Sequence, residues 1–460
     1  MKKFIRIIVT VLLAFIVAHS VAARGGKEQA AEVQPAEFEF WTSQHQSDRM
    51  STIQLLVDTF QALNPRIKVT VVAVEENDLP KQVAASSAAG TLPAIAEFGS
   101  ENALAFGAEG LLDVDANTQL INSIGKKRYY SGTLKLLEIP KKGSYYALLY
   151  HGWIQGIWYR SDWFKDAGLA APEKWSDIEK ASKTFYKPDQ NQYGILVGTK
   201  AEVYSEQCFT QFAISNKARL FDKNGKLIFN SPAMKKTIEY YAGLAKYNPP
   251  GPQTWRARDY YLQGKMAGFF YSTYIMDDLA LQDVAAGSLT NEHFKDLKGG
   301  TFDPDLANKT GFAPKISNKQ PSSYGVIVAL GIFKSDDAAE TAGAKKFIEF
   351  MYTEDAYVSF LHMAVGGMNP VLKEISASEK FMEDPKGIFK RYGKQKMGEI
   401  ISGLENIQRF GIVEGNLIED YGKIFAQQII PQMIYKITQE NMDVQKAMDW
   451  AEAEMKKAIE

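Results

Sequence analysis

Residues 38–74, FEFWTSQHQSDRMSTIQLLVDTFQALNPRIKVTVVAV, decide the fold. Residues 38–41 are rich in aromatic side chains and predict a short strand. Residues 48–64 then place apolar side chains at helical spacing until Pro65, which cannot continue a helix. Residues 68–74 are β-branched and predict a second strand. A strand, a helix and a strand in this order are typical of a parallel sheet.

The same alternation continues outward from this stretch. We expect a helix over residues 78–89 that ends at Gly90, a strand over 94–98 and a helix over 102–109. Strands that alternate with helices form sheets covered on both faces, and ligands bind beyond the C-terminal ends of the strands. The predicted ligand crevice is therefore lined by the segments that follow the three strands, residues 41–45, 75–77 and 97–101.

A second α/β region follows in the chain. Residues 145–159 form an aromatic and aliphatic run that is predicted to pass between two lobes. Residues 314–321 are a candidate second crossing, and residues 324–330 and 336–352 predict a buried strand and a helix. The rest of the chain is predicted to be helical and to end in a helix over 443–459.

Composition excludes several classes of protein. The chain has 460 residues, 45% of them hydrophobic and 23% charged, and its formal net charge is -1. These values are typical of a globular protein with two or three domains, and not of a disordered chain. A charge near zero removes the attraction on which nucleic-acid binders depend, so no nucleic-acid partner is expected. The single cysteine, Cys208, excludes a disulfide framework within the chain.

The N-terminus predicts export. Residues 1–23 combine a basic start, a 12-residue apolar stretch and a small-residue exit, which is typical of a secretory signal peptide. Residues 24–36 have no apolar periodicity and are interpreted as a flexible leader. Removing the first 23 residues takes away three cations, which leaves 50 basic against 54 acidic side chains. We expect a mildly acidic protein in the periplasm or outside the cell.

Motifs for catalysis are missing from the sequence. There is no Gly-x-Ser-x-Gly, His-Glu-x-x-His, phosphate-loop or dinucleotide-binding pattern. The histidines are scattered, so no metal site and no cofactor are expected. Paired carboxylates such as Glu97 and Glu101 could serve a glycosidase, which needs two acids about 5 to 10 Å apart. Acidic side chains can equally accept hydrogen bonds from sugar hydroxyls.

Several stretches, taken together and in this order, resemble the extracellular solute-binding proteins of ABC importers, specifically the carbohydrate-binding group. They are FQALNPRIKV (60–69), AGTLPAI (89–95), GLLD (110–113), WYRSD (158–162), GKMA (264–267) and DVQKAM (443–448). The resemblance extends from about residue 38 to the C-terminus. Ala94 and residues 266–268 depart from the pattern of the group, which puts the local geometry of the pocket in doubt.

The resemblance implies a two-lobed α/β fold of the periplasmic-binding-protein type II class, with a sheet flanked by helices in each lobe. It implies three crossings, near residues 149–153, 318–322 and 368–371. The N-terminal lobe would be residues 37–150 plus 320–368, and the C-terminal lobe 151–319 plus 369–460. It also implies a monomer without enzymatic activity or catalytic residues, which captures a carbohydrate, most simply an oligosaccharide, and delivers it to the transmembrane subunits of an ABC permease.

A sugar site needs flat aromatic surfaces for the C–H faces of the ring and polar side chains for its hydroxyls. Several side chains in the crevice segments and in the parts that match the group could supply both. The predicted ligand-binding residues are Trp41, Gln44, His45, Glu76, Glu97, Phe98, Glu101, Trp153, Glu206, Trp255, Tyr271 and Tyr274.

Two alternatives stay open at this point. The ligand could be a phosphorylated polyol or another small anion, which should show as a cluster of cations in the crevice. The segments considered above offer mainly Arg49, Arg256 and Arg258. A secreted carbohydrate-active enzyme with the same crevice is the other alternative.

Overall fold

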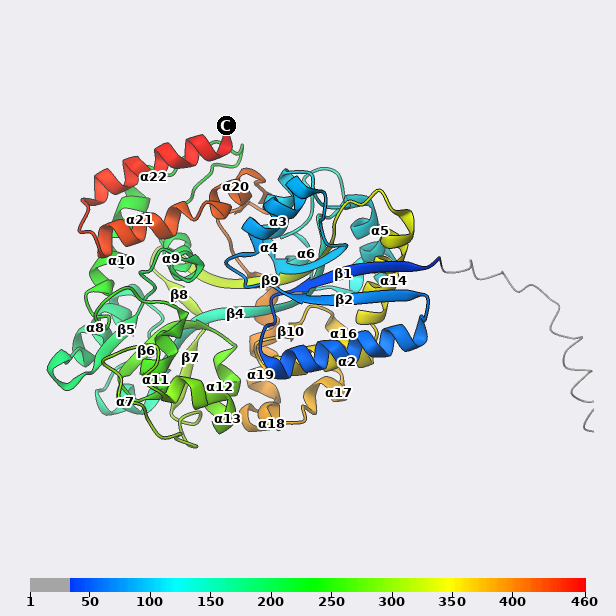
Figure 1. Ribbon diagram of the computed structural model, residues 1–460. Helices are drawn as coiled ribbons and strands as arrows, with labels where there is room; N and C mark the ends of the chain where they lie inside the picture. Colours follow the sequence, from blue (N-terminus) through cyan, green and yellow to red (C-terminus); the bar gives the residue numbers. More distant parts are fainter. Residues whose placement is uncertain (1–33) are drawn as a thin grey trace, which may run out of the picture.

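The computed structural model describes residues 34–460 (Figure 1). The expected signal peptide, residues 1–23, and most of the expected leader lie outside the described residues. None of the helices within residues 34–460 is both long and apolar enough to cross a membrane.

The strands and helices alternate along most of the chain. The strands are β1 (Ala36–Thr42), β2 (Ile67–Ala73), β3 (Ile95–Gly99), β4 (Leu148–Arg160), β5 (Tyr193–Leu196), β6 (Met266–Ser272), β7 (Thr310–Ala313), β8 (Lys315–Ser317), β9 (Pro321–Ile332), β10 (Asn369–Pro370), β11 (Ile412–Val413) and β12 (Asn416–Leu417). The helices up to β9 are α2 (Ser47–Leu63), α3 (Leu79–Ala89), α4 (Ser100–Ala108), α5 (Val114–Ile124), α6 (Ser131–Leu134), α7 (Ser161–Asp166), α8 (Trp175–Phe185), α9 (Val203–Ser215), α10 (Pro232–Ala245), α11 (Arg258–Leu262), α12 (Ile275–Ala280) and α13 (Gln282–Ala285). The helices after β9 are α14 (Ala338–Met351), α15 (Glu354–Leu361), α16 (Lys373–Ala377), α17 (Glu379–Met382), α18 (Ile388–Tyr392), α19 (Lys394–Ser402), α20 (Asp420–Ala426), α21 (Ile429–Thr438) and α22 (Val444–Ile459).

The central sheet has the strand order β2-β1-β3-β9-β4-β6-β5, with β7 and β10 paired to β4 and β8 paired to β9. At one end β1 pairs in parallel with β2 and β3, and at the other end β5 pairs in parallel with β6. The long strands β9 and β4 lie between these ends and are antiparallel to their neighbours. The βαβ units predicted from the N-terminal sequence are therefore present.

The two long strands divide the sheet into two sides. We call β2, β1 and β3 with helices α2 and α4 the β1 side, and β6 and β5 with helices α9, α11 and α12 the β6 side (Figure 1). The first part of β4 pairs with β9 and its last part with β6 and β7. The pairing of β4 with β9 is irregular between Leu149 and His151, and β10 pairs with His151 and Gly152 at the same level. This irregularity lies within residues 149–153, and the positions of the crossings near 149–153, 318–322 and 368–371 stay a prediction.

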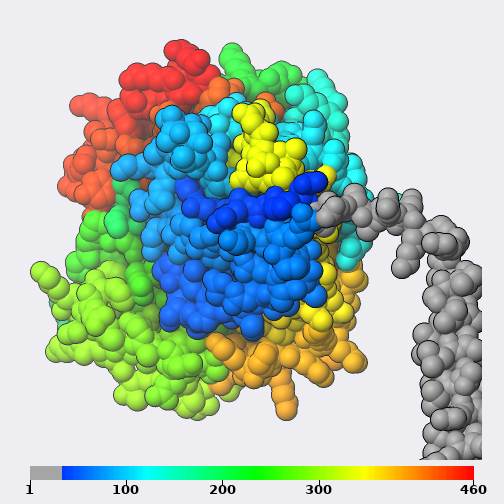
Figure 2. All heavy atoms as spheres, turned by 45° about the vertical axis from the view of Figure 1, so that its right-hand side comes forward, coloured from blue at the N-terminus to red at the C-terminus, as the bar shows by residue number. Residues whose placement is uncertain are grey.

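The N-terminal elements form for the reasons that the sequence suggested. Helix α2 ends at Leu63, two residues before Pro65. Helix α3 ends at Gly90, which has the left-handed φ of 69° that glycine adopts without strain. Phe347 of α14 packs against the rings of Phe40 and Phe60, with ring centroids 5.4 and 5.1 Å apart. Figure 2 shows the yellow α14 region beside the blue N-terminal segments on one face of the molecule.

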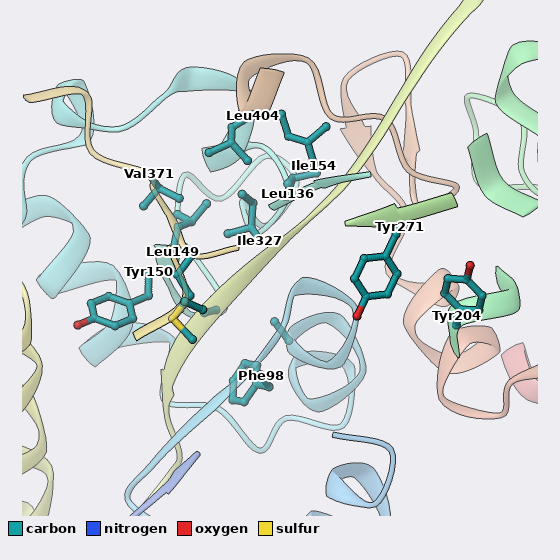
Figure 3. Packing of buried hydrophobic residues seen from close by; sticks show 14 of the residues in the cluster. Phe98, Leu136, Leu149, Tyr150, Ile154, Tyr204, Tyr271, Ile327, Val371 and Leu404 are labelled. Atoms are coloured by element: carbon teal, nitrogen blue, oxygen red, sulfur yellow. The ribbon is translucent and has the colours of Figure 1, made fainter. Parts of the chain in front are cut away.

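Buried aromatic side chains form much of the core on both sides of the sheet. Figure 3 shows Phe98, Tyr150, Tyr204 and Tyr271 among the buried cluster. Trp175 stacks on Tyr240 with ring centroids 4.0 Å apart. Most of the aromatic content of the chain is therefore structural, as is the small side chain of Cys208, which is fully buried.

The C-terminal helices contact both sides of the sheet. Helix α20 packs against α4 of the β1 side, whereas α21 packs against α9 of the β6 side. Near β10, the hydroxyl groups of Tyr130 and Ser376 lie 2.8 Å apart, which connects α16 to the segment between α5 and α6. The segment 369–460 therefore touches both ends of the sheet.

Candidate functional site

A cavity of about 640 Å³ lies between the β1 side and the β6 side. On the β1 side it is lined by the segments that follow β1, β2 and β3, which are the crevice segments expected from the strand order. On the β6 side it is lined by residues near the start of α11 and by residues at and after the end of β6. The lining of the cavity includes charged, amide and aromatic side chains, so it can recognise a polar ligand that also has apolar faces.

Glu97 is the buried acid at the β1 wall of the cavity. Its carboxylate accepts hydrogen bonds from the hydroxyl of Thr42 and, at 2.9 Å, from Nε2 of Gln44. Nε2 of His151 lies 3.1 Å from the same carboxylate, and both side chains are fully buried. Burial by itself would raise the pKa of Glu97, but the hydrogen bond and charge of His151, with the bonds from Thr42 and Gln44, lower it below its ordinary value. Glu97 is therefore an ionised acceptor that fixes Gln44 at the cavity.

Glu97→Gln is expected to lower the free energy of unfolding at pH 7 by about 1–3 kcal/mol. The NH₂ group of the new glutamine would lie against the groups that now donate to the carboxylate, those of Thr42, Gln44 and His151. The depressed pKa of Glu97 stabilises the fold above the ordinary pKa of a glutamate, and this contribution is lost as the pH falls. The difference in free energy of unfolding between the variant and the unmodified protein should therefore be smaller at pH 4 than at pH 7, as measured by urea unfolding. Glu109→Gln is the exposed control. An equal deficit at both pH values would contradict this role of Glu97.

Two further acids line the β1 side. Oε1 of Glu75 lies 3.4 Å from Nε2 of His45, and both side chains are largely exposed to the solvent in the cavity. The pKa of Glu76 is raised, first by desolvation between the cavity walls and then by repulsion from Glu97 and Glu75. The side chain of Glu76 still reaches solvent, so this desolvation is incomplete. Glu76 can accept hydrogen bonds from ligand hydroxyl groups.

An exposed tryptophan stands on the β6 side. Trp255 keeps 36% of its surface exposed, although most large apolar side chains of the described chain are buried. The guanidinium carbons of Arg256 and Arg258 lie 4.3 and 5.1 Å from its ring centroid. Arg258 also donates a 2.9 Å bond to Asp278. These contacts hold the indole of Trp255 at the cavity, and the part of the ring that stays exposed can contact a ligand.

Two adjacent acids, Asp277 and Asp278, lie in α12 just beyond the end of β6 and line the cavity. Both are buried, and burial raises the pKa of each carboxyl. The pKa of Asp278 reaches about 7 even though Arg258 opposes the shift. One carboxylate oxygen of Asp278 has no hydrogen-bond partner within the described structure. Asp277 and Asp278 therefore form a buried acidic wall of the cavity on the β6 side.

The predicted ligand-binding residues separate into two groups. Those that line the cavity are Gln44, His45, Glu76, Glu97, Phe98, Trp153, Trp255, Tyr271 and Tyr274. Trp41, Glu101 and Glu206 lie outside it. The indole nitrogen of Trp41 donates a 2.7 Å bond to Glu39, and the ring is buried. Glu101 forms an ion pair with Arg409, and Glu206 accepts a 2.9 Å bond from Tyr421.

Some cavity residues were not among the predicted ones. Asp277 and Asp278 could have been found from the same rule that selected the loops after β1 and β3, because they follow β6. Arg49 and Arg258 were considered only as candidate anion ligands. Gln155, in the last part of β4, has no signal in the sequence beyond its place in the apolar run. Within residues 34–460 there is no group of acidic, histidine or cysteine side chains that could hold a metal ion.

Comparisons with known proteins place the chain in a family. The family model for bacterial extracellular solute-binding proteins matches residues 44–358. The chain is 27% identical over 451 residues to YcjN of Escherichia coli (strain K12), whose name describes it as an ABC transporter periplasmic-binding protein, and the alignment covers 98% of each chain.

Solved structures share the fold. A solute-binding protein of Agrobacterium radiobacter K84 in complex with ribitol has a TM-score of 0.73 at 17% identity, covering 92% of this chain and 99% of that one. Maltose-bound MalE3 of T. maritima has a TM-score of 0.70 at 16% identity, with the same coverage. The sheet described above, flanked by helices, is thus the periplasmic-binding-protein type II fold. Since the family model also spans most of the chain, the protein belongs to the bacterial extracellular solute-binding protein family.

Proposed function

We propose that the protein captures a neutral carbohydrate in the cavity and delivers it, as a monomer, to the transmembrane subunits of an ABC permease. The β1 side and the β6 side would act as two lobes, residues 37–150 plus 320–368 and residues 151–319 plus 369–460. The segment 1–23 would direct export to the periplasm or the outside of the cell. A ligand that contacts both lobes favours the closed arrangement by its difference in affinity for the two states.

The observation that carries this proposal is the chemistry of the cavity lining, in which aromatic faces stand among more carboxylates than cations. The lining carboxylates are Asp48, Glu75, Glu76, Glu97, Glu202, Asp277, Asp278 and Asp283, and the cations are Arg49, Arg256, Arg258 and Lys386. Carboxylates accept hydrogen bonds from hydroxyl groups and repel anions. A neutral polyhydroxylated ligand fits such a lining.

The same observation argues against a phosphorylated polyol or another small anion. Arg258 is already paired with Asp278 at 2.9 Å, and Arg49 donates a 3.0 Å bond to Gln44. The ionised carboxylate of Glu97 at the β1 wall would oppose an anion. Among the structural relatives, one holds ribitol and another maltose, which are both neutral, whereas UgpB of Mycobacterium tuberculosis holds glycerophosphocholine, so the proposal depends on the cavity lining. A volume of about 640 Å³ is in the range of sites for small molecules and is compatible with a sugar, a polyol or a short oligosaccharide.

A thermal-shift screen tests the proposal most directly, with ribitol, hexitols, monosaccharides, maltose, longer maltooligosaccharides and glycerol phosphate as probes. A neutral probe at a hundred times its dissociation constant should stabilise the fold by roughly 2.7 kcal/mol, and the melting temperature should rise. Stabilisation by glycerol phosphate alone would contradict a neutral ligand. Turnover of any oligosaccharide by the purified protein would contradict a role limited to binding.

Trp255→Ala should weaken binding of the stabilising neutral probe roughly tenfold, because loss of an aromatic stacking surface costs about 1–2 kcal/mol. Isothermal titration calorimetry measures the dissociation constant. Trp450→Ala is the matched control, because Trp450 lies on α22, outside the cavity lining, and also has a cation over its ring, Lys436, at 4.8 Å. An unchanged dissociation constant in Trp255→Ala would remove Trp255 from the site.

A further inference from the structure

One cation contacts both sides of the cavity. Arg49 lies in the first turn of α2, on the β1 side, and lines the cavity. Its guanidinium donates a 3.0 Å hydrogen bond to Oε1 of Gln44 on the same side. The guanidinium carbon also lies 5.5 Å from the ring centroid of Tyr274, which follows β6. Arg49 therefore joins the β1 side to the β6 side through a cation–π contact.

The ring of Tyr274 is held in place where the two sides meet, by residues of β4, β9 and the segment before β10. A Cβ atom at Gly367 would lie 2.3 Å from Cδ1 of Tyr274, so the ring rests directly on the glycine backbone next to β10. Tyr274 also packs against the cluster of Trp153, Tyr324 and Val326. Because these contacts fix the ring, the guanidinium of Arg49 covers an aromatic surface that would otherwise be open to the cavity.

The acids of the β6 side strengthen the attraction across the cavity. Burial raises the pKa of Asp277, and the charge of Arg49 opposes this shift more than any other cation does. Arg49 likewise counteracts the effect of burial on Asp278. The positive charge of Arg49 thus favours a short distance between the two sides even when no ligand is bound.

We propose that Arg49 is a latch that holds the two sides of the cavity together in the unliganded protein by covering the ring of Tyr274. A sugar that stacks on Tyr274 must first displace the guanidinium. The latch goes beyond the proposed function, because its action on the unliganded protein does not depend on which ligand the cavity takes.

Small-angle X-ray scattering of the unliganded protein tests the latch. A cation–π contact of ordinary strength changes the ratio of open to closed molecules by about 2- to 30-fold. In Arg49→Ala the radius of gyration should rise by on the order of 1 Å above the roughly 22 Å of a compact chain of this size. Lys183→Ala is the control, since Lys183 is exposed, pairs with Glu179 at 2.5 Å within α8 and lies outside the cavity lining.

Variants of the ring separate a latch from a general structural effect. Tyr274→Phe keeps the aromatic face and should keep the compact state, and Tyr274→Leu should expand the protein as much as Arg49→Ala does. Arg49→Lys keeps the charge and should restore part of the compaction. The double variant Arg49→Ala with Tyr274→Leu should expand no further than either single variant. A radius of gyration that is unchanged in Arg49→Ala, or expansions that add in the double variant, would overturn the latch. A failure of sugar binding would leave these measurements unaffected.

Discussion

Glu206→Gln is expected to reduce the loss of stability that the protein undergoes as the pH rises from about 5 to 8. Glu206 is 1% exposed, and burial raises its pKa to about 8 against the hydrogen bond from Tyr421. The folded state therefore keeps a proton that the unfolded chain releases near its ordinary pKa of 4.5. Stability from Glu206 is present in full below pH 4.5 and is lost as the pH approaches 8, by on the order of 4 kcal/mol.

Glutamine has the same shape, has no proton to lose in this range and keeps an oxygen that can accept the hydrogen bond of Tyr421. The free energy of unfolding of Glu206→Gln, relative to the unmodified protein, should thus increase steadily in urea titrations at pH 5, 6, 7 and 8. Glu179→Gln is the control, because Glu179 is exposed and pairs with Lys183 at 2.5 Å. A slope against pH equal to that of the unmodified protein would show that Glu206 titrates normally.

Glu206→Gln also tests whether Glu206 has a structural role or binds the ligand. Glu206 was predicted to bind ligand, but it lies outside the cavity lining. Its carboxylate contacts Tyr421, 215 residues later in the chain. The sequence around Glu206 does not predict this partner, because a contact between residues so far apart in the chain depends on how α20 packs. The affinity of Glu206→Gln for a neutral sugar should therefore be unchanged.

Local sequence predicted the N-terminal sheet well because its signals are local. The end of α2 next to Pro65 and the glycine end of α3 at Gly90 need no tertiary information. The loops after β1 and β3 could be placed at the ligand crevice, since strand direction alone decides which loops gather there. For this reason Gln44 and Glu97, both expected at the crevice, line the cavity.

The rest of the site depends on long-range packing. Trp41 faces away from the cavity although it stands at the end of β1, because successive residues of a strand point to opposite faces. Arg49 was considered only as a possible anion ligand, and its contact with Tyr274 follows from the meeting of two sides that are 225 residues apart in sequence. Glu101 follows β3 closely but belongs to α4, where it meets the C-terminal segment instead of the cavity.

Arg409→Leu is expected to lower the free energy of unfolding by about 3–5 kcal/mol, because it leaves a buried carboxylate without its partner. Arg409 is 5% exposed and forms an ion pair with Glu101, which is equally buried. Its guanidinium also donates a 2.6 Å bond to the carbonyl of Gly325 and lies 4.7 Å from the ring centroid of Tyr324. Both residues belong to β9, one of the strands that pass between the two sides. Chemical denaturation measures the loss.

The double variant Glu101→Gln with Arg409→Leu decides whether the loss comes from the unpaired charge. It removes both charges, so no buried charge is left without a partner. The double variant should therefore be more stable than Arg409→Leu alone. Arg128→Leu is the matched control, because the pair of Arg128 with Glu374 is exposed and should contribute less than about 1 kcal/mol. A loss in Arg409→Leu as small as that of the control would mean that water solvates Glu101.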